Sequence, residues 1–101
     1  LMVEYAFRTG ADRVELYTGP YAELFTTDPK RAIEKYRAAA EKAHELGLGM
    51  NAGHDLNLKI LKPFIKAFPW TAEVSIGHAI ICDALYLGIQ ETIQEYLDLL
   101  K

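Results

Sequence analysis

Two short segments of the chain alternate hydrophobic and polar residues, a third is a brief apolar run, and the longer segments between them repeat hydrophobic residues at helical spacing. Alternation predicts a β-strand, and spacing of three and four residues predicts an amphipathic helix. We expect strands at residues 12–18, 48–53 and 71–76. We expect helices at residues 3–9, 28–46, 56–68, 79–87 and 89–100.

Local signals mark several element boundaries. Asp28 and Pro29 suit the N-cap and the first position of a helix. The dipeptide at residues 19–20, Gly-Pro, predicts a turn. Pro63 lies inside a helical pattern, so we expect a kink or two short helices there. Strands that alternate with helices favour right-handed βαβ units and a parallel sheet.

The two faces of the predicted strands differ in polarity. The apolar face comprises Val14, Leu16, Val74 and Ile76, and the other carries Glu15, Glu73 and Ser75, with Gly49 and Asn51 at equivalent positions. A sheet covered by helices on both sides would bury these carboxylates, and an unpaired buried charge is costly. A closed (β/α)8 barrel places them in its lumen instead, so we expect an α/β fold of the TIM-barrel class.

A first group of candidate functional residues follows the second predicted strand. His54 could transfer a proton near neutral pH, and Gly53 permits an unusual backbone angle and a close approach to a ligand. Active sites of parallel α/β folds lie at the carboxyl ends of strands. The alternative is a polar turn in which Asp55 or Asn57 caps the next helix.

A second candidate lies where the third predicted strand meets a helix. Gly77 and His78 would expose backbone N–H groups at the helix N-terminus, where the dipole favours an anion such as phosphate. A tight strand-to-helix turn is the alternative. Glu15, in the middle of the first predicted strand, is either a catalytic carboxylate or part of an ion-pair network with Arg13 and Glu73.

Composition narrows the class of protein. The chain has 101 residues, half of them hydrophobic, and a net charge of −3, which fits one globular domain and excludes a disordered chain. No apolar stretch is long enough to cross a membrane, and the scattered cations give no nucleic-acid surface. The histidines lack metal-ligand spacing, so we expect no metal or other cofactor. The single cysteine, Cys82, favours a reducing, cytoplasmic location and is expected in the core.

Three motifs occur together in the chain, at residues 14–22 (VELYTGPYA), 51–57 (NAGHDLN) and 73–79 (EVSIGHA). Their order and spacing resemble those of pyridoxine 5′-phosphate synthases. The resemblance implies a (β/α)8 barrel, commonly a homo-octamer, without a cofactor. It also implies the condensation of 1-deoxy-D-xylulose 5-phosphate with 3-amino-2-oxopropyl phosphate, which gives pyridoxine 5′-phosphate, phosphate and water.

Residue by residue, Glu15 resembles the carboxylate of this family that stabilises the transition state, and His54 resembles its catalytic acid. The backbone at Asp55, Gly77 and His78 resembles its binding positions for aminooxopropyl phosphate. Position 55 is Gly in some members, and the carboxylate side chain here must turn away from the phosphate.

The chain is shorter than a complete barrel. The resemblance implies that residues 1–101 are the C-terminal portion of one barrel domain, with about its last three βα units, and Leu1 in place of Met agrees with truncation. The family's general bases lie in earlier strands, so we expect the fragment to be inactive alone. The alternative is a non-catalytic partial-barrel module that binds phosphate or self-assembles, because three parallel strands leave two open edges.

Overall fold

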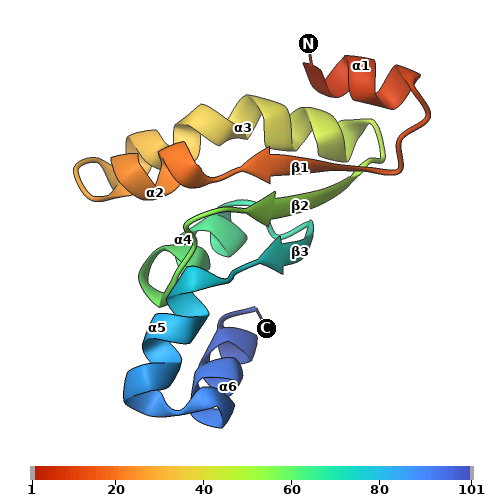
Figure 1. Ribbon diagram of the computed structural model, residues 1–101. Coiled ribbons are helices and arrows are strands. Elements are labelled where there is room, and N and C mark those ends of the chain that lie inside the picture. The colour runs from red at the N-terminus through yellow and green to blue at the C-terminus, as the bar shows by residue number, and fades with distance from the viewer. Residues whose placement is uncertain (1, 101) are drawn as a thin grey trace.

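The computed structural model describes residues 2–100, in which helices and strands alternate (Figure 1). The elements in chain order are α1 (Met2–Arg8), β1 (Arg13–Tyr17), α2 (Gly19–Phe25), α3 (Pro29–Glu45), β2 (Gly49–Gly53), α4 (Leu58–Ala67), β3 (Thr71–Ser75), α5 (His78–Leu87) and α6 (Ile89–Leu99). Every predicted strand and helix is present, and no boundary differs from its predicted position by more than two residues.

The three strands form the parallel sheet that the sequence predicted, in the order β1-β2-β3. Glu15 pairs with Asn51, which pairs with Glu73, so the polar positions lie in one row across the sheet. Within the described residues β1 and β3 are edge strands. The structure therefore shows a three-stranded βα unit that is consistent with part of a barrel.

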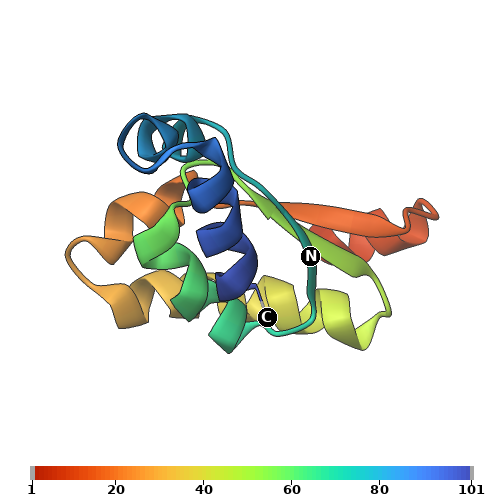
Figure 2. The same cartoon turned by 90° about the horizontal axis from the view of Figure 1, so that it is seen from below.

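The core lies on the opposite face of the sheet, under α3 and α4 (Figure 2). Met50 and Ala52 of the central strand are fully buried against Phe64 of α4 and Ala40 of α3. The predicted division into an apolar and a polar face is thus confirmed. The polar face is left open to the pocket described below.

Capping side chains fix the starts of α3 and α4. Asp28 accepts a hydrogen bond from Arg31 N at 3.2 Å, as its position before Pro29 predicted. Asn57 accepts from the N–H groups of the next helix at 2.9 and 3.1 Å. Of the two caps that the sequence offered, Asn57 rather than Asp55 therefore precedes α4.

Two local features differ from, or narrow, what the sequence predicted. The segment after β1 is the short helix α2 rather than a simple turn, because Gly19 and Pro20 occupy its first turn, where proline needs no N–H partner. Its Tyr21 is fully buried, donates to Ile60 O at 2.6 Å and has a pKa raised by burial. Pro63 lies within α4, which runs as one helix from Leu58 to Ala67, so of the two predicted alternatives the pair of short helices is wrong.

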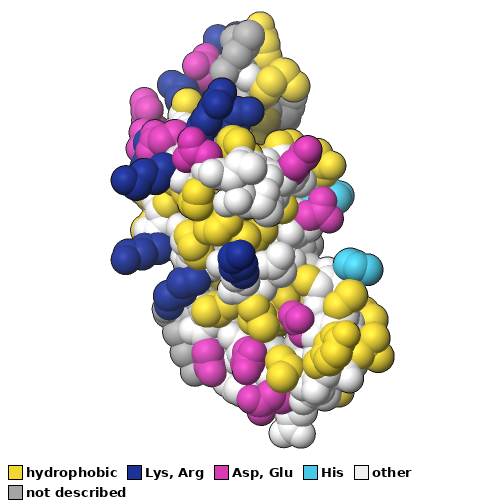
Figure 3. All heavy atoms as spheres, turned by 90° about the vertical axis from the view of Figure 1, so that its left-hand side faces the viewer, with side chains coloured by type: hydrophobic (Ala, Val, Ile, Leu, Met, Phe, Trp, Pro, Cys, Tyr) yellow, Lys and Arg dark blue, Asp and Glu magenta, His cyan; other side chains and the backbone are white. Residues whose placement is uncertain are grey.

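The position of Cys82 also differs from prediction. It is only partly buried, because α5 contains no buried residue. Leu85 and Tyr86 of this helix are 81% and 90% exposed. Hydrophobic side chains accordingly gather on the surface over α5 and α6, in the lower part of Figure 3.

Candidate functional site

An open pocket of about 490 Å³ lies at the carboxyl ends of the three strands. Its lining residues are Glu15, Gly53, His54, Asp55, Ser75, Ile76, Gly77 and His78. All five residues singled out from the sequence as catalytic or binding positions are among them. The structure thus brings together, in one pocket, groups that the chain separates by up to about sixty residues.

The loop after β2 carries an unusual backbone. His54 and Asp55 have φ of 90° and 60°, in the left-handed region that side chains seldom adopt. The expectation that Gly53 supplies an unusual backbone angle is wrong, because the positive φ falls on the next two residues. An Asp at position 55 fits this conformation, since Asp and Asn tolerate it better than most residues.

Gly53 serves the site through close approach. A Cβ atom there would lie 3.2 Å from Oε1 of Glu15 and 3.4 Å from Cβ of Ser75. The missing side chain therefore leaves room for the Glu15 carboxylate to lie across the end of β2. The group that approaches Gly53 here is the Glu15 side chain, and the predicted close approach to a ligand stays a prediction.

The aromatic ring of Tyr17 supports His54. The two rings meet edge to face, with centroids 4.7 Å apart and an interplanar angle of 72°. Tyr17 in turn lies over Gly19, where a Cβ would come within 2.7 Å of its Oη atom. The backbone carbonyl of Tyr17 accepts a 2.6 Å hydrogen bond from the Tyr36 hydroxyl. These contacts give the imidazole a defined wall on one side.

Thr18 was not identified from the sequence. It is fully buried, and its hydroxyl lies 2.7 Å from the carbonyl oxygens of both Gly53 and His54. Its backbone N–H donates to the Gly53 carbonyl at 2.8 Å. The sequence signal for Thr18 was its place between the end of a predicted strand and a glycine. That signal is weak, because only the strand register shows which residues lie beside the hydroxyl.

The start of α5 forms the opposite wall. Gly77 is the N-cap residue and makes no side-chain capping bond, and a Cβ there would meet no atom within 4 Å. The first N–H groups of the helix therefore lie beside open space, where the helix dipole favours an anion. The ring nitrogen Nε2 of His78 lies 3.4 Å from Sγ of Cys82 one turn later.

Arg13 forms an ion pair with a carboxylate of the polar row, that of Glu73. Its guanidinium forms an ion pair with Glu73 at 2.9 Å and lies 3.4 Å from Oδ1 of Asn51. The interpretation of Arg13 and Glu73 as an ion pair is thus confirmed. Its partner is Glu73 rather than Glu15, whose carboxylate lines the pocket.

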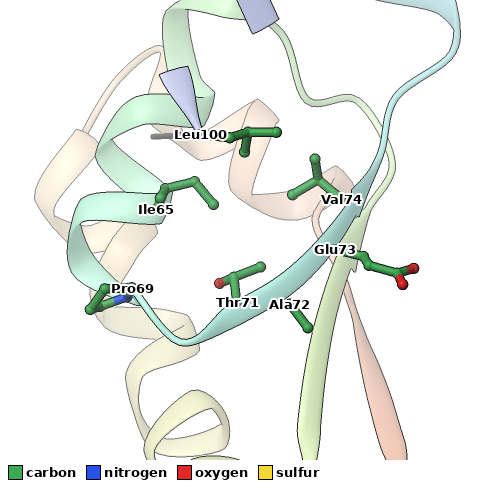
Figure 4. Close-up of a pocket in the computed structure, with 7 residues that line it drawn as sticks. All are labelled: Ile65, Pro69, Thr71, Ala72, Glu73, Val74 and Leu100. Atoms are coloured by element: carbon green, nitrogen blue, oxygen red, sulfur yellow. The ribbon is translucent and has the colours of Figure 1, made fainter. Parts of the chain in front are cut away.

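A second recess of about 130 Å³ lies between β3 and the end of α4 (Figure 4). Its lining is mostly apolar, and the carboxylate of Glu73 points away from it (Figure 4). Among residues 2–100 no group of three or more His, Cys, Asp or Glu side chains could hold a metal ion. No helix in the described range is long and apolar enough to span a membrane.

The family model described as "Pyridoxal phosphate biosynthesis protein PdxJ" matches residues 1–101. The chain belongs to the PdxJ family. Curated proteins named pyridoxine 5′-phosphate synthase are similar: that of Bacteroides fragilis is 57% identical over 100 residues, and that of Phocaeicola vulgatus is 53% identical over 100 residues. In both, the alignment covers 99% of this chain and 42% of the relative.

Membership of the PdxJ family confirms the resemblance drawn from the three motifs. The chain spans about 42% of the length of the curated relatives it matches. Every residue that lines the pocket belongs to one of the three motifs. The motifs by which the family resemblance was recognised therefore converge on one site.

Proposed function

We propose that this chain is part of a pyridoxine 5′-phosphate synthase and supplies about the last three βα units of its (β/α)8 barrel. The pocket at the carboxyl ends of the strands carries the proposal, because it joins a histidine, a carboxylate and an exposed helix N-terminus. In a closed barrel the row of Glu15, Asn51 and Glu73 faces the lumen, and the edges of β1 and β3 pair with further strands.

Each group has a chemical task in this reaction. The N–H groups at Gly77 and His78, with that of Asp55, bind the phosphate of 3-amino-2-oxopropyl phosphate. His54 donates a proton as the ring with 1-deoxy-D-xylulose 5-phosphate closes. The Glu15 carboxylate stabilises positive charge that develops in the transition state. The general bases come from other strands, so the residues described here do not complete the reaction alone.

The family resemblance extends the proposal to assembly and location. We place the whole protein in the cytoplasm as a homo-oligomer, and the partly exposed Cys82 suits a reducing compartment. A second candidate is a non-catalytic, self-assembling module that binds phosphate. The two unpaired sheet edges and the exposed apolar surface of α5 favour it.

Product formation separates the two candidates. We expect the full-length protein that carries this chain to convert both phosphate substrates into pyridoxine 5′-phosphate with release of inorganic phosphate. Chromatography of the product and a phosphate assay measure both. A full-length protein that binds phosphate yet forms no product would overturn the synthase in favour of the module.

Replacing Gly77 by valine should weaken substrate binding more than stability. A Cβ at this position meets no atom within 4 Å, so the fold accommodates a side chain, which then stands over the helix N-terminus. Loss of charge-assisted hydrogen bonds should raise KM for 3-amino-2-oxopropyl phosphate roughly 10- to 100-fold. Steady-state kinetics of the full-length protein measure this, and Gly77→Ala should give a smaller rise. An unchanged KM in Gly77→Val would contradict this anion site.

A further inference from the structure

We propose that Thr18 is a positioning residue that holds the His54 loop in its active conformation, an inference that rests on the proposed function. Thr18 is fully buried and is not among the residues that line the pocket. Its position directly after β1 places it beside the end of β2. It therefore acts, in our proposal, through the residue that it orients.

The hydroxyl of Thr18 departs from its usual task. Thr18 is the N-cap residue of α2, where a threonine side chain commonly accepts a bond from the first turn of its own helix. Here it makes no such capping bond. Instead the hydroxyl turns to the neighbouring strand and lies 2.7 Å from the carbonyl oxygens of Gly53 and His54. The Thr18 hydroxyl thus bonds to the loop after β2 and does not cap α2.

The loop has a conformation that needs such support. Two successive residues with side chains, His54 and Asp55, have positive φ. Such residues persist only where their surroundings hold them, and they concentrate at functional sites. The carbonyl groups that converge on the Thr18 hydroxyl flank the first of these two residues. One buried hydroxyl therefore contacts the peptide units on both sides of His54, and its single proton is shared between their two carbonyl oxygens.

The consequence is a fixed direction for the imidazole. With its backbone held, His54 places its ring against Tyr17 at the edge of the pocket. Displacement of a reacting group by about 1 Å can lower a rate by about a hundredfold. Removal of the hydroxyl should therefore affect turnover through the geometry of His54, and not through the core.

The test replaces Thr18 in the full-length protein. Thr18→Val keeps the shape and removes the hydroxyl, and it should lower kcat by roughly 10- to 100-fold. Thr18→Ser keeps the hydroxyl and should restore most of the rate. Thr92→Val is the matched control, because Thr92 is equally buried and its hydroxyl has no hydrogen-bond partner among residues 2–100. That variant should turn over like the wild type.

Two further readouts separate positioning from a merely structural role. In a His54→Ala background, Thr18→Val should lower the remaining rate by less than about twofold, because residues that act as a unit are not additive. A crystal structure of Thr18→Val should show residues 54 and 55 leaving positive φ or the imidazole displaced from Tyr17. If the valine variant does not fold, Thr18→Ala serves the same comparison.

Wild-type kcat in Thr18→Val, or a wild-type loop in its crystal structure, would overturn the proposal. An added loss of rate in the His54→Ala background would also overturn it, since Thr18 would then act by another route. A wild-type protein that forms no pyridoxine 5′-phosphate would overturn the proposed function instead. In that case the crystal structure still decides whether Thr18 holds the loop.

Discussion

Replacing His54 by alanine should lower the rate of pyridoxine 5′-phosphate synthesis by about 10²- to 10⁴-fold, the range that a positioned general acid contributes. The imidazole lies in an exposed loop at the pocket and takes no part in the buried core, so the fold should survive its removal. The measurement is kcat of the full-length variant, with circular dichroism to show that the fold is retained.

His44→Ala is the matched control for His54. His44 stacks on Trp70 with ring centroids 4.5 Å apart, and it does not line the pocket. We expect this variant to retain nearly full turnover. Wild-type turnover in His54→Ala would remove His54 from the mechanism, whereas equal losses in both variants would point to a general effect on folding.

Replacing Glu15 by glutamine should be the next most damaging change, with a loss of about 10²- to 10³-fold in kcat. Glutamine keeps the size of the side chain, and Gly53 still leaves space for it at the end of β2. The variant therefore removes the negative charge and little else. Steady-state kinetics of the full-length protein measure the effect, which should appear in kcat more than in KM.

The same polar row offers the control for this charge. Glu73→Gln removes an exposed carboxylate that is paired with Arg13, and exposed pairs stabilise proteins by about 1 kcal/mol or less. Its effect on turnover should be less than about tenfold. If Glu73→Gln and Glu15→Gln cost the same, the role assigned to the Glu15 charge would be contradicted.

Local patterns were sufficient to predict most of the described elements and the group of residues that lines the pocket. Alternation of polarity predicted β1 and β3, and Asp28 before Pro29 predicted the start of α3. Both are properties of neighbouring residues. The pocket followed from a general rule about the carboxyl ends of parallel strands together with three short motifs.

The remaining features depend on contacts between distant segments. The helix α2 was missed because Gly19 and Pro20 fit both a turn and a first helical turn, and burial of Tyr21 decides between them. The role of Thr18 depends on the strand register, which places it beside Gly53 and His54, 35 and 36 positions later in the chain. Cys82 was predicted to lie in the core because α5 is rich in apolar residues. An apolar sequence alone does not show whether the helix packs against the rest of the described chain, and α5 has no buried residue.

The central claim is that this chain holds the acid and phosphate-binding groups of a synthase that needs further strands for turnover. The most direct test measures pyridoxine 5′-phosphate formation by the 101-residue chain and by the full-length protein, at equal concentration with both substrates. We predict product, with inorganic phosphate, from the full-length protein and none above background from the 101-residue chain. Clear turnover by the 101-residue chain alone would contradict the account.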